Sequence, residues 1–136
     1  MPLIKWDENL SVGVKALDED HQRLLNMVND LHDAIMLGRA RDVLGGVLDG
    51  MVKYTETHFA REEQLLVQTH YRGRAAHKRE HENLTLRVKD LQTHYNNHEP
   101  AALSIETINF LKTWLVKHIQ GSDKKYGPHL NAKGIH

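Results

Sequence analysis

The chain has 136 residues, of which 40% are hydrophobic, enough to bury the core of one domain. Eighteen basic residues balance eighteen acidic ones and are scattered, so we expect neither nucleic acid nor membrane insertion. The chain has no cysteine, so it can form no disulfide and must hold any metal through nitrogen and oxygen. It also lacks a secretory signal pattern and a membrane-spanning apolar run, so we expect a cytoplasmic protein.

The N-terminal half predicts an arm followed by two helices. Residues 1–17 carry no sustained helical period and predict an ordered or semi-ordered arm. A first helix is predicted over residues 18–38, with Asp18 as its N-terminal cap and a glycine at its C-terminal end. A second is predicted over residues 42–68, although Gly45, Gly46 and Gly50 fall in its first half. These glycines permit a close helix approach, a bend or a late helix start, and the sequence leaves the three open.

The C-terminal half predicts two more helices. A third helix, over residues 74–95, carries apolar residues and histidines in alternating steps of four and three. A fourth is predicted over residues 104–120, capped by Ser104, and residues 128–136 are expected to form a loose tail. Four amphipathic helices with short connections predict an all-α, up-down-up-down four-helix bundle with an N-terminal arm, forming one domain over residues 1–136.

Five histidines and two acids fall at spacings that suit metal binding. In two helix segments a pair of them is four residues apart, so both members lie on one face, about 40° from each other. Imidazoles combined with carboxylates favour a pair of transition metals such as iron, zinc or copper over calcium or magnesium. The predicted ligands are His21, His58, Glu62, His77, His81, His118 and Asp123.

The last two predicted ligands have a less regular spacing. His118 and Asp123 are five residues apart and would diverge by about 140° in an uninterrupted helix. We therefore expect the fourth helix to break or tighten at Gly121 and Ser122, so that Asp123 returns to the side of His118.

The order of these motifs (H, then H-x3-E, H-x3-H and H-x4-D) resembles the hemerythrin family over nearly the whole chain. The short arm, the length and the Asp-Lys-x-Tyr sequence from Asp123 to Tyr126 are similar to its single-domain bacterial members, the bacteriohemerythrins. The resemblance implies a non-haem di-iron centre bridged by oxide or hydroxide. It assigns one iron to His77, His81 and His118, the other to His21 and His58, and the bridging carboxylates to Glu62 and Asp123.

The resemblance further implies reversible dioxygen binding rather than catalysis. Such binding would serve oxygen storage, delivery to an oxygen-consuming enzyme, or sensing, and we expect a monomer. By similarity the dioxygen pocket is lined by Phe59, Trp114, Leu115 and Ile119. The alternative is a di-iron enzyme that acts on dioxygen, peroxide or nitric oxide.

Two rival interpretations explain less of the sequence. His77-Lys78-Arg79-Glu80-His81 matches the H-x-x-E-H signature of some zinc peptidases but leaves five of the seven predicted ligands without a role. A ferritin-like oxidase would need E-x-x-H motifs, and this chain has none. Glu63, Glu80 and Glu82 are either partners of ligand N–H groups or surface charges. We assign structural or surface roles to the remaining histidines: His32, His70, His94, His98, His129 and His136.

Overall fold

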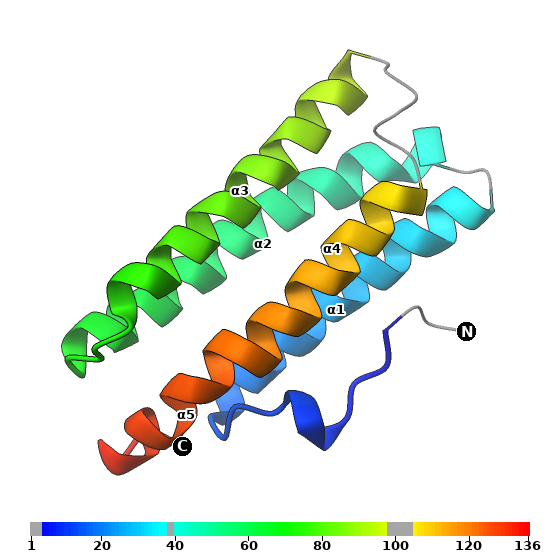
Figure 1. The fold of residues 1–136 in the computed structure, drawn as a ribbon. Helices are drawn as coiled ribbons and strands as arrows, with labels where there is room; N and C mark the ends of the chain where they lie inside the picture. Colours follow the sequence, from blue (N-terminus) through cyan, green and yellow to red (C-terminus); the bar gives the residue numbers. More distant parts are fainter. Residues whose placement is uncertain (1–3, 38–39, 98–104) are drawn as a thin grey trace.

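The computed structural model describes residues 4–37, 40–97 and 105–136. Its long helices are α1 (Lys15–Met36), α2 (Ala40–Gln68), α3 (Arg74–Asn96) and α4 (Ile105–Lys117). Three shorter elements are the 3-10 turn η1 (Glu8–Leu10), the π-helix η3 (His118–Asp123) and the helix α5 (Lys124–Ala132). Consecutive long helices run in opposite directions (Figure 1), which confirms the predicted four-helix bundle.

The bundle is held by apolar side chains that the four helices direct inward. Helix α1 packs against α2 and α4, and α2 packs against α3. On α1 the residues Leu17, Leu24 and Leu31, seven apart, are each at most 2% exposed. Burying a leucine side chain contributes about 1.5–3 kcal/mol, so this stripe and its counterparts on the other helices provide much of the stability. No helix in the described part of the chain is long and apolar enough to cross a membrane.

Helix α1 begins three residues earlier than predicted, and Asp18 is not its cap. The capping position is Val14, which makes no side-chain hydrogen bond to the helix. The Asp18 carboxylate instead accepts hydrogen bonds from the Val12 N–H at 2.8 Å and the Ser11 hydroxyl at 2.6 Å. Asp18 therefore ties the arm to the first turn of α1.

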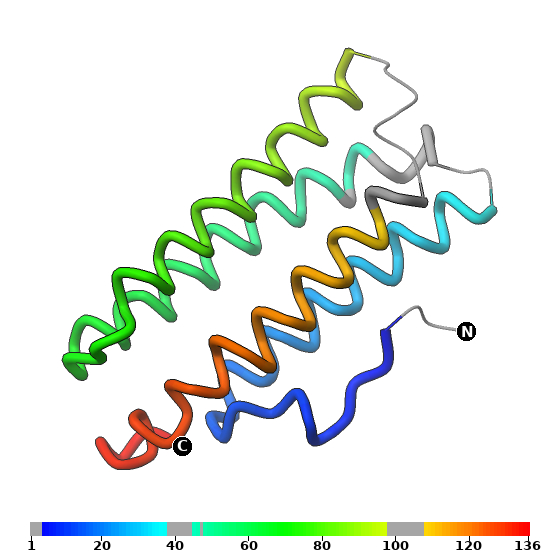
Figure 2. The backbone as a smooth tube through the Cα atoms, viewed as in Figure 1, coloured from blue at the N-terminus to red at the C-terminus, as the bar shows by residue number. Residues whose placement is uncertain are grey.

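The arm is ordered over its described residues. Ile4 is bound at both backbone groups by Asn29 of α1: its N–H donates to Oδ1, and its carbonyl accepts from Nδ2, each at 2.8 Å. Leu10 and Val12 are buried against the bundle. The arm follows the start of α1 toward the end of the bundle where the C-terminal residues lie (Figure 2).

The glycines of α2 do not interrupt the helix, which is continuous from Ala40 to Gln68. A Cβ added at Gly45 would lie only 3.0 Å from a ring carbon of Tyr95 on α3, whereas Gly46 and Gly50 have no such neighbour within 4 Å. Among the alternatives that the sequence left open, close approach therefore applies to Gly45. The predicted helix end at Gly38 and cap at Ser104 lie outside the described residues.

The expected loose tail is wrong for its first residues, because α5 continues through Pro128 to Ala132. Proline lacks the N–H for one helical hydrogen bond, but tight packing offsets this loss. Tyr126 and Leu130 are completely buried, and a Cβ at Gly127 would overlap the carbonyl oxygen of Val12. The C-terminal segment therefore packs on the arm.

Candidate metal centre

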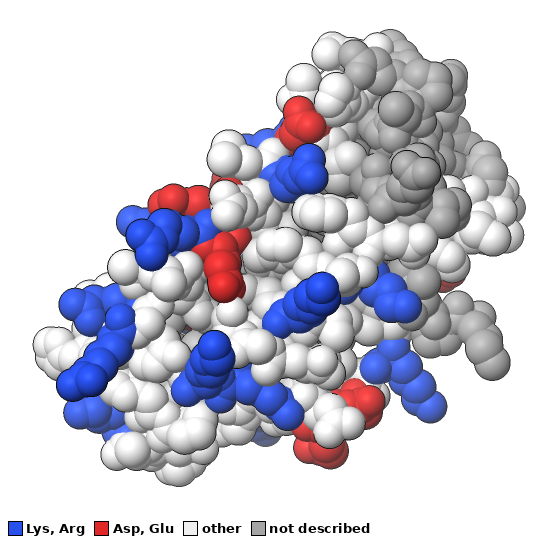
Figure 3. All heavy atoms as spheres, viewed as in Figure 1, with Lys and Arg blue, Asp and Glu red and all other residues white. Residues whose placement is uncertain are grey.

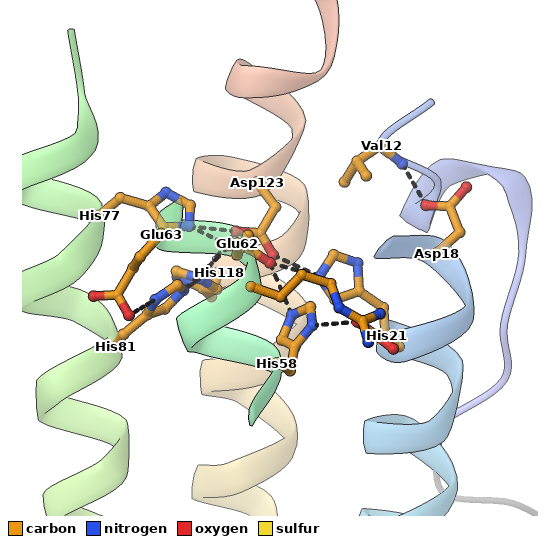
Figure 4. A network of polar contacts seen from close by, with 12 residues as sticks. Val12, Asp18, His21, His58, Glu62, Glu63, His77, His81, His118 and Asp123 are labelled. Carbon is orange, nitrogen blue, oxygen red and sulfur yellow. Dashed lines mark hydrogen bonds and ion pairs between the residues drawn. The ribbon is translucent and has the colours of Figure 1, made fainter. Parts of the chain in front are cut away.

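Seven polar side chains, from α1, α2, α3 and η3, converge inside the bundle (Figure 4). Each is at most 5% exposed, although histidine, glutamate and aspartate are seldom buried so completely. They are the seven predicted ligands: His21 on α1, His58 and Glu62 on α2, His77 and His81 on α3, and His118 and Asp123 on η3.

The two pairs with a spacing of four lie as the helical period predicts. On α2 the Nε2 atom of His58 is 2.8 Å from Oε2 of Glu62. On α3 the ring centres of His77 and His81 are 4.6 Å apart. Residues four apart stack along one face of an α-helix, so the local fold alone aims both pairs at the centre.

The pair with a spacing of five is aligned by a π-helix rather than by the predicted break. Backbone hydrogen bonds in a π-helix span five residues instead of four, so each turn takes about one residue more. His118 and Asp123 then share a face, and His118 Nε2 lies 3.0 Å from Asp123 Oδ1. The prediction of a break or tightening at Gly121 and Ser122 is therefore wrong: the helix widens there and continues into α5.

The carboxylate of Glu62 lies between two sets of imidazoles. Its Oε1 atom is 2.6 Å from His77 Nε2 and 3.2 Å from His81 Nε2. Its Oε2 atom is 2.8 Å from His58 Nε2 and 3.4 Å from His21 Nε2. One oxygen therefore faces α3, and the other faces the histidines of α1 and α2.

The carboxylate of Asp123 repeats this division. Its Oδ1 atom is 2.8 Å from His77 Nε2 and 3.0 Å from His118 Nε2, and its Oδ2 atom is 3.0 Å from His21 Nε2. The side chains form two groups that share Glu62, and within each group the ligand atoms lie within 4.8 Å of one another. The larger group has three histidines and the smaller has two.

Without metal, the two buried carboxylates of the centre favour protons on His21 and His77. Burial disfavours charge on Glu62, yet hydrogen bonds from His21 and His58 hold its pKa well below the usual range. Burial likewise lowers the pKa of a histidine, but the nearby carboxylates of Asp123 and Glu62 raise the pKa of His21 to about 10 and that of His77 to about 9. Every ion pair described for these two carboxylates is with a histidine, so no lysine or arginine of the described residues compensates them.

The donor set fits a pair of metal ions. Both oxygens of Asp123 are buried without a hydrogen bond of good geometry, and the Nε2 atoms of His81 and His118 face each other at 3.1 Å. Buried polar atoms without hydrogen bonds are rare in folded proteins. Cations bound between these atoms would provide partners for the Asp123 oxygens and for the Nε2 atoms of His81 and His118. A set of five imidazoles and two carboxylates suits iron.

Carboxylates outside the centre bind the other ring nitrogen of two predicted ligands. His118 Nδ1–H donates to Glu80 at 2.6 Å, and His58 Nδ1–H donates to Asp20 at 3.0 Å. Such partners orient metal-binding imidazoles and make them better donors. The sequence left the role of Glu80 open and missed Asp20, because no spacing along the chain links a residue of α1 to one of α2.

The position of Glu80 also argues against the zinc-peptidase interpretation. In that signature the glutamate between the two histidines acts as a base beside the metal. Here the Glu80 carboxylate is 44% exposed and contacts the outer nitrogen of His118. Glu63 lies 3.9 Å from His81 Nδ1, and Glu82 lines a groove of about 450 Å³ between α2 and α3.

Of the four predicted pocket residues, two stack on histidines of the centre and two are buried in the apolar core of the bundle. The Phe59 ring stacks on His81 at 3.8 Å, and the Trp114 ring stacks on His118 at 4.5 Å. Ile119 is fully buried beside His118 in the chain, and Leu115 lines a small apolar cavity in the bundle core. These residues place apolar groups around the predicted ligands.

Three histidines outside the predicted ligand set, His70, His94 and His129, have structural or surface surroundings. His129 Nε2–H donates to the Thr69 carbonyl at 2.8 Å, and His94 lies 3.4 Å from Asp90 on the surface. His70 is exposed and adopts a left-handed backbone conformation after α2, which histidine tolerates better than most residues. His98 lies outside the described residues.

Charge on the molecular surface is less evenly mixed than the zero net charge suggests. Figure 3 shows basic side chains gathered over the end of the bundle where α3 begins and α4 leads into α5. Exposed cations here include Arg72, Arg74, Lys78 and Lys125. Two acids of the charge balance, Glu62 and Asp123, are buried in the centre and add nothing to the surface.

Comparison with known proteins agrees with the geometry of the centre. A family model described as the Hemerythrin HHE cation binding domain matches residues 12–130. The chain is 37% identical over 133 residues to the bacteriohemerythrin of Methylococcus capsulatus, covering 97% of this chain and 100% of the relative. It is 36% identical over 132 residues to the bacteriohemerythrin of Stenotrophomonas maltophilia, covering 97% and 84%. A crystal structure of wild-type hemerythrin aligns with a TM-score of 0.87 at 36% identity, covering 94% of this chain and 98% of that one. The chain therefore belongs to the hemerythrin family.

Proposed function

We propose that the protein binds dioxygen reversibly at a pair of iron ions held by the seven side chains of the centre. Hemerythrins are known for binding dioxygen at a di-iron site. The observation that supports the proposal most directly is the orientation of the two buried carboxylates. Each has one oxygen toward the three-histidine group and one toward the two-histidine group, as bridging ligands require.

The unequal histidine count supports a position for dioxygen. The group of His21 and His58 offers one histidine fewer than the group of His77, His81 and His118, so it would leave more room for an outside ligand. We therefore expect dioxygen at the iron of His21 and His58. The other iron would be held by His77, His81 and His118, with Glu62, Asp123 and a solvent-derived oxide or hydroxide between the two. When bound, the iron pair supplies the reversible electron exchange with dioxygen.

The remaining task for the chain is to exclude water. Dioxygen binding stays reversible only if protons and water do not carry away a reduced product. Phe59, Leu115 and Ile119 are at most 5% exposed, and the apolar surroundings they provide would keep the centre dry. Storage, delivery to an oxygen-consuming enzyme and sensing would all use this same site.

A spectroscopic cycle tests the proposal. Iron-loaded, anaerobically reduced protein is measured in the visible range before oxygen, after oxygen, and again after the oxygen is removed. We expect a colour that appears with oxygen and disappears with its removal, in the wild type and in a surface control, His94→Ala. His81→Ala should lose the colour, since it removes one nitrogen donor from the centre. A colour that persists, or sustained product formation under air, would support an oxidase and contradict reversible binding.

A further inference from the structure

Asp20 of α1 connects a predicted metal ligand to the protein surface through three hydrogen bonds. Its Oδ2 atom accepts from His58 Nδ1–H and from the Arg61 guanidinium, each at 3.0 Å. Its Oδ1 atom accepts from the Tyr54 hydroxyl at 2.7 Å. The Asp20 side chain is 11% exposed, whereas that of Arg61 is 51% exposed. A nearly buried carboxylate therefore lies between a ligand imidazole and a cation at the surface.

These contacts hold the His58 ring through Nδ1, the ring nitrogen that does not face Glu62. A carboxylate acceptor at Nδ1 keeps the proton on that nitrogen, so the lone pair of Nε2 points toward Glu62, 2.8 Å away. Tyr54 and Arg61 hold Asp20 in place and leave it little freedom to turn. His21, the other histidine of the smaller group, differs: its Nδ1 atom is buried and has no hydrogen-bond partner in the described part of the chain.

We propose that Asp20 is a positioning residue that orients His58 and increases its electron donation to the metal, and that Arg61 limits this donation as a counter-charge. The proposal rests on the proposed di-iron function, because it concerns the iron to which we expect dioxygen to bind. It deepens that function by naming residues that tune how readily this iron is oxidised. Carboxylates bound to the outer nitrogen of a metal-bound histidine raise the basicity of the ligand.

The charges of Asp20 and Arg61 give opposite predictions for their substitution. The negative charge of Asp20, which is bound to His58 Nδ1, would stabilise the more positive, oxidised iron. Asp20→Asn keeps an oxygen that can accept the Nδ1–H hydrogen bond but removes the charge, so it should favour the reduced centre. Arg61→Gln leaves Asp20 less compensated, so it should favour the oxidised centre. If Asp20 and Arg61 served only packing, their two substitutions would not shift the balance of reduced and oxidised centre in opposite directions.

The test is a redox titration of iron-loaded wild type, Asp20→Asn and Arg61→Gln. For Asp20→Asn we expect the ratio of reduced to oxidised centre at a fixed potential to rise about tenfold, about 59 mV for a one-electron couple. For Arg61→Gln we expect a fall of about twofold to threefold, smaller because solvent screens the exposed guanidinium. Asp30→Asn and Arg72→Gln are matched controls that remove the same charges from exposed positions, and they should leave the ratio unchanged. Shifts of the same sign in the two test variants, or equal shifts in the controls, would overturn the proposal.

A second measurement separates this proposal from the di-iron assignment. In zinc-loaded protein, NMR detects the His58 Nδ1–H proton and its exchange with water without any need for iron. We expect slow exchange in the wild type and in Asp20→Asn, and rapid exchange in Asp20→Ala, with zinc affinity about 10- to 100-fold weaker in the last variant. Rapid exchange in the wild type would overturn the role of Asp20. Zinc binding without iron binding would contradict the di-iron function while leaving the orientation of His58 by Asp20 intact.

Discussion

Metal binding to this centre should release protons, and the pKa values of its histidines set how many. Burial lowers the pKa values of His21 and His77, but the nearby carboxylates of Asp123 and Glu62 outweigh burial and raise these pKa values to about 10 and about 9. Both rings are therefore protonated at pH 7 in the metal-free protein, and a metal can bind either Nε2 only after its proton leaves. Each displaced proton makes the affinity rise about tenfold per pH unit, so two protons give about a hundredfold per unit below pH 9.

The assay is a metal titration of chelator-treated protein, with ferrous iron under anaerobic conditions or with zinc. Proton release is measured with a pH indicator in weakly buffered solution, and affinity by competition with a chelator of known proton uptake. We expect at least two protons released per filled centre at pH 7, with release declining above pH 9. His94→Ala, which removes a surface histidine, should release the same number. An affinity that does not change between pH 6.5 and 8.5 would refute this account of the charges.

The same pKa values predict how the stability of the metal-free protein depends on pH. A histidine whose pKa is raised stabilises the fold fully below its ordinary value of 6.5, and this stabilisation is lost as the pH rises through about 9 to 10. The lowered pKa values of Glu62 and Asp123 have the opposite sign: their stabilisation is present above about pH 4.5 and lost as the pH falls. Denaturant unfolding should therefore show greatest metal-free stability between about pH 4.5 and 6.5, and a gap between metal-loaded and metal-free protein that widens with pH.

Three substitutions test other parts of the account. Leu115→Gln should speed autoxidation several-fold, because it brings a polar group to the apolar surroundings of the centre; the decay of the oxygenated spectrum measures this, and an unchanged rate would count against the pocket assignment. Glu62→Ala should lose most of the iron, since one residue serves both groups, and full iron content by metal analysis would rule out the bridge. Gly127→Ala should destabilise the fold by about 1–3 kcal/mol, because the added Cβ overlaps the Val12 carbonyl. Thermal unfolding measures that loss, and Gly46→Ala, which meets no neighbour within 4 Å, is the control expected to be neutral or stabilising.

The fold and the seven converging side chains were predictable because both depend on helical periodicity. The predicted ligands on α2 and α3 are four residues apart, and apolar residues recur at steps of three and four on each helix, so local spacing carries the information. The alignment of His118 with Asp123 was not predictable in the same way. A spacing of five required some departure from the α-helix, but the sequence did not distinguish a break from the wider π-helical turn that the chain adopts.

Features that depend on contacts between distant segments were the ones the sequence missed. Asp18 has the residue type of a helix cap, yet its carboxylate binds the arm at Val12. Residues 128–136 were expected to form a loose tail, but the fit of Gly127 against the arm orders α5. Asp20 on α1 accepts a hydrogen bond from His58 on α2. In each case tertiary packing decided among conformations that local preference left possible.

Reversible dioxygen binding by the iron pair is tested most directly by the amount of dioxygen that reduced, iron-loaded protein takes up. Iron per chain is measured by metal analysis, and oxygen uptake by an oxygen electrode, first on addition of air-saturated buffer and then after evacuation and a second addition. We predict two irons per chain, matching the two groups of predicted ligands, and one dioxygen for each pair, recovered on evacuation and taken up again in equal amount. One iron per chain, or oxygen that is consumed and cannot be recovered, would contradict this prediction.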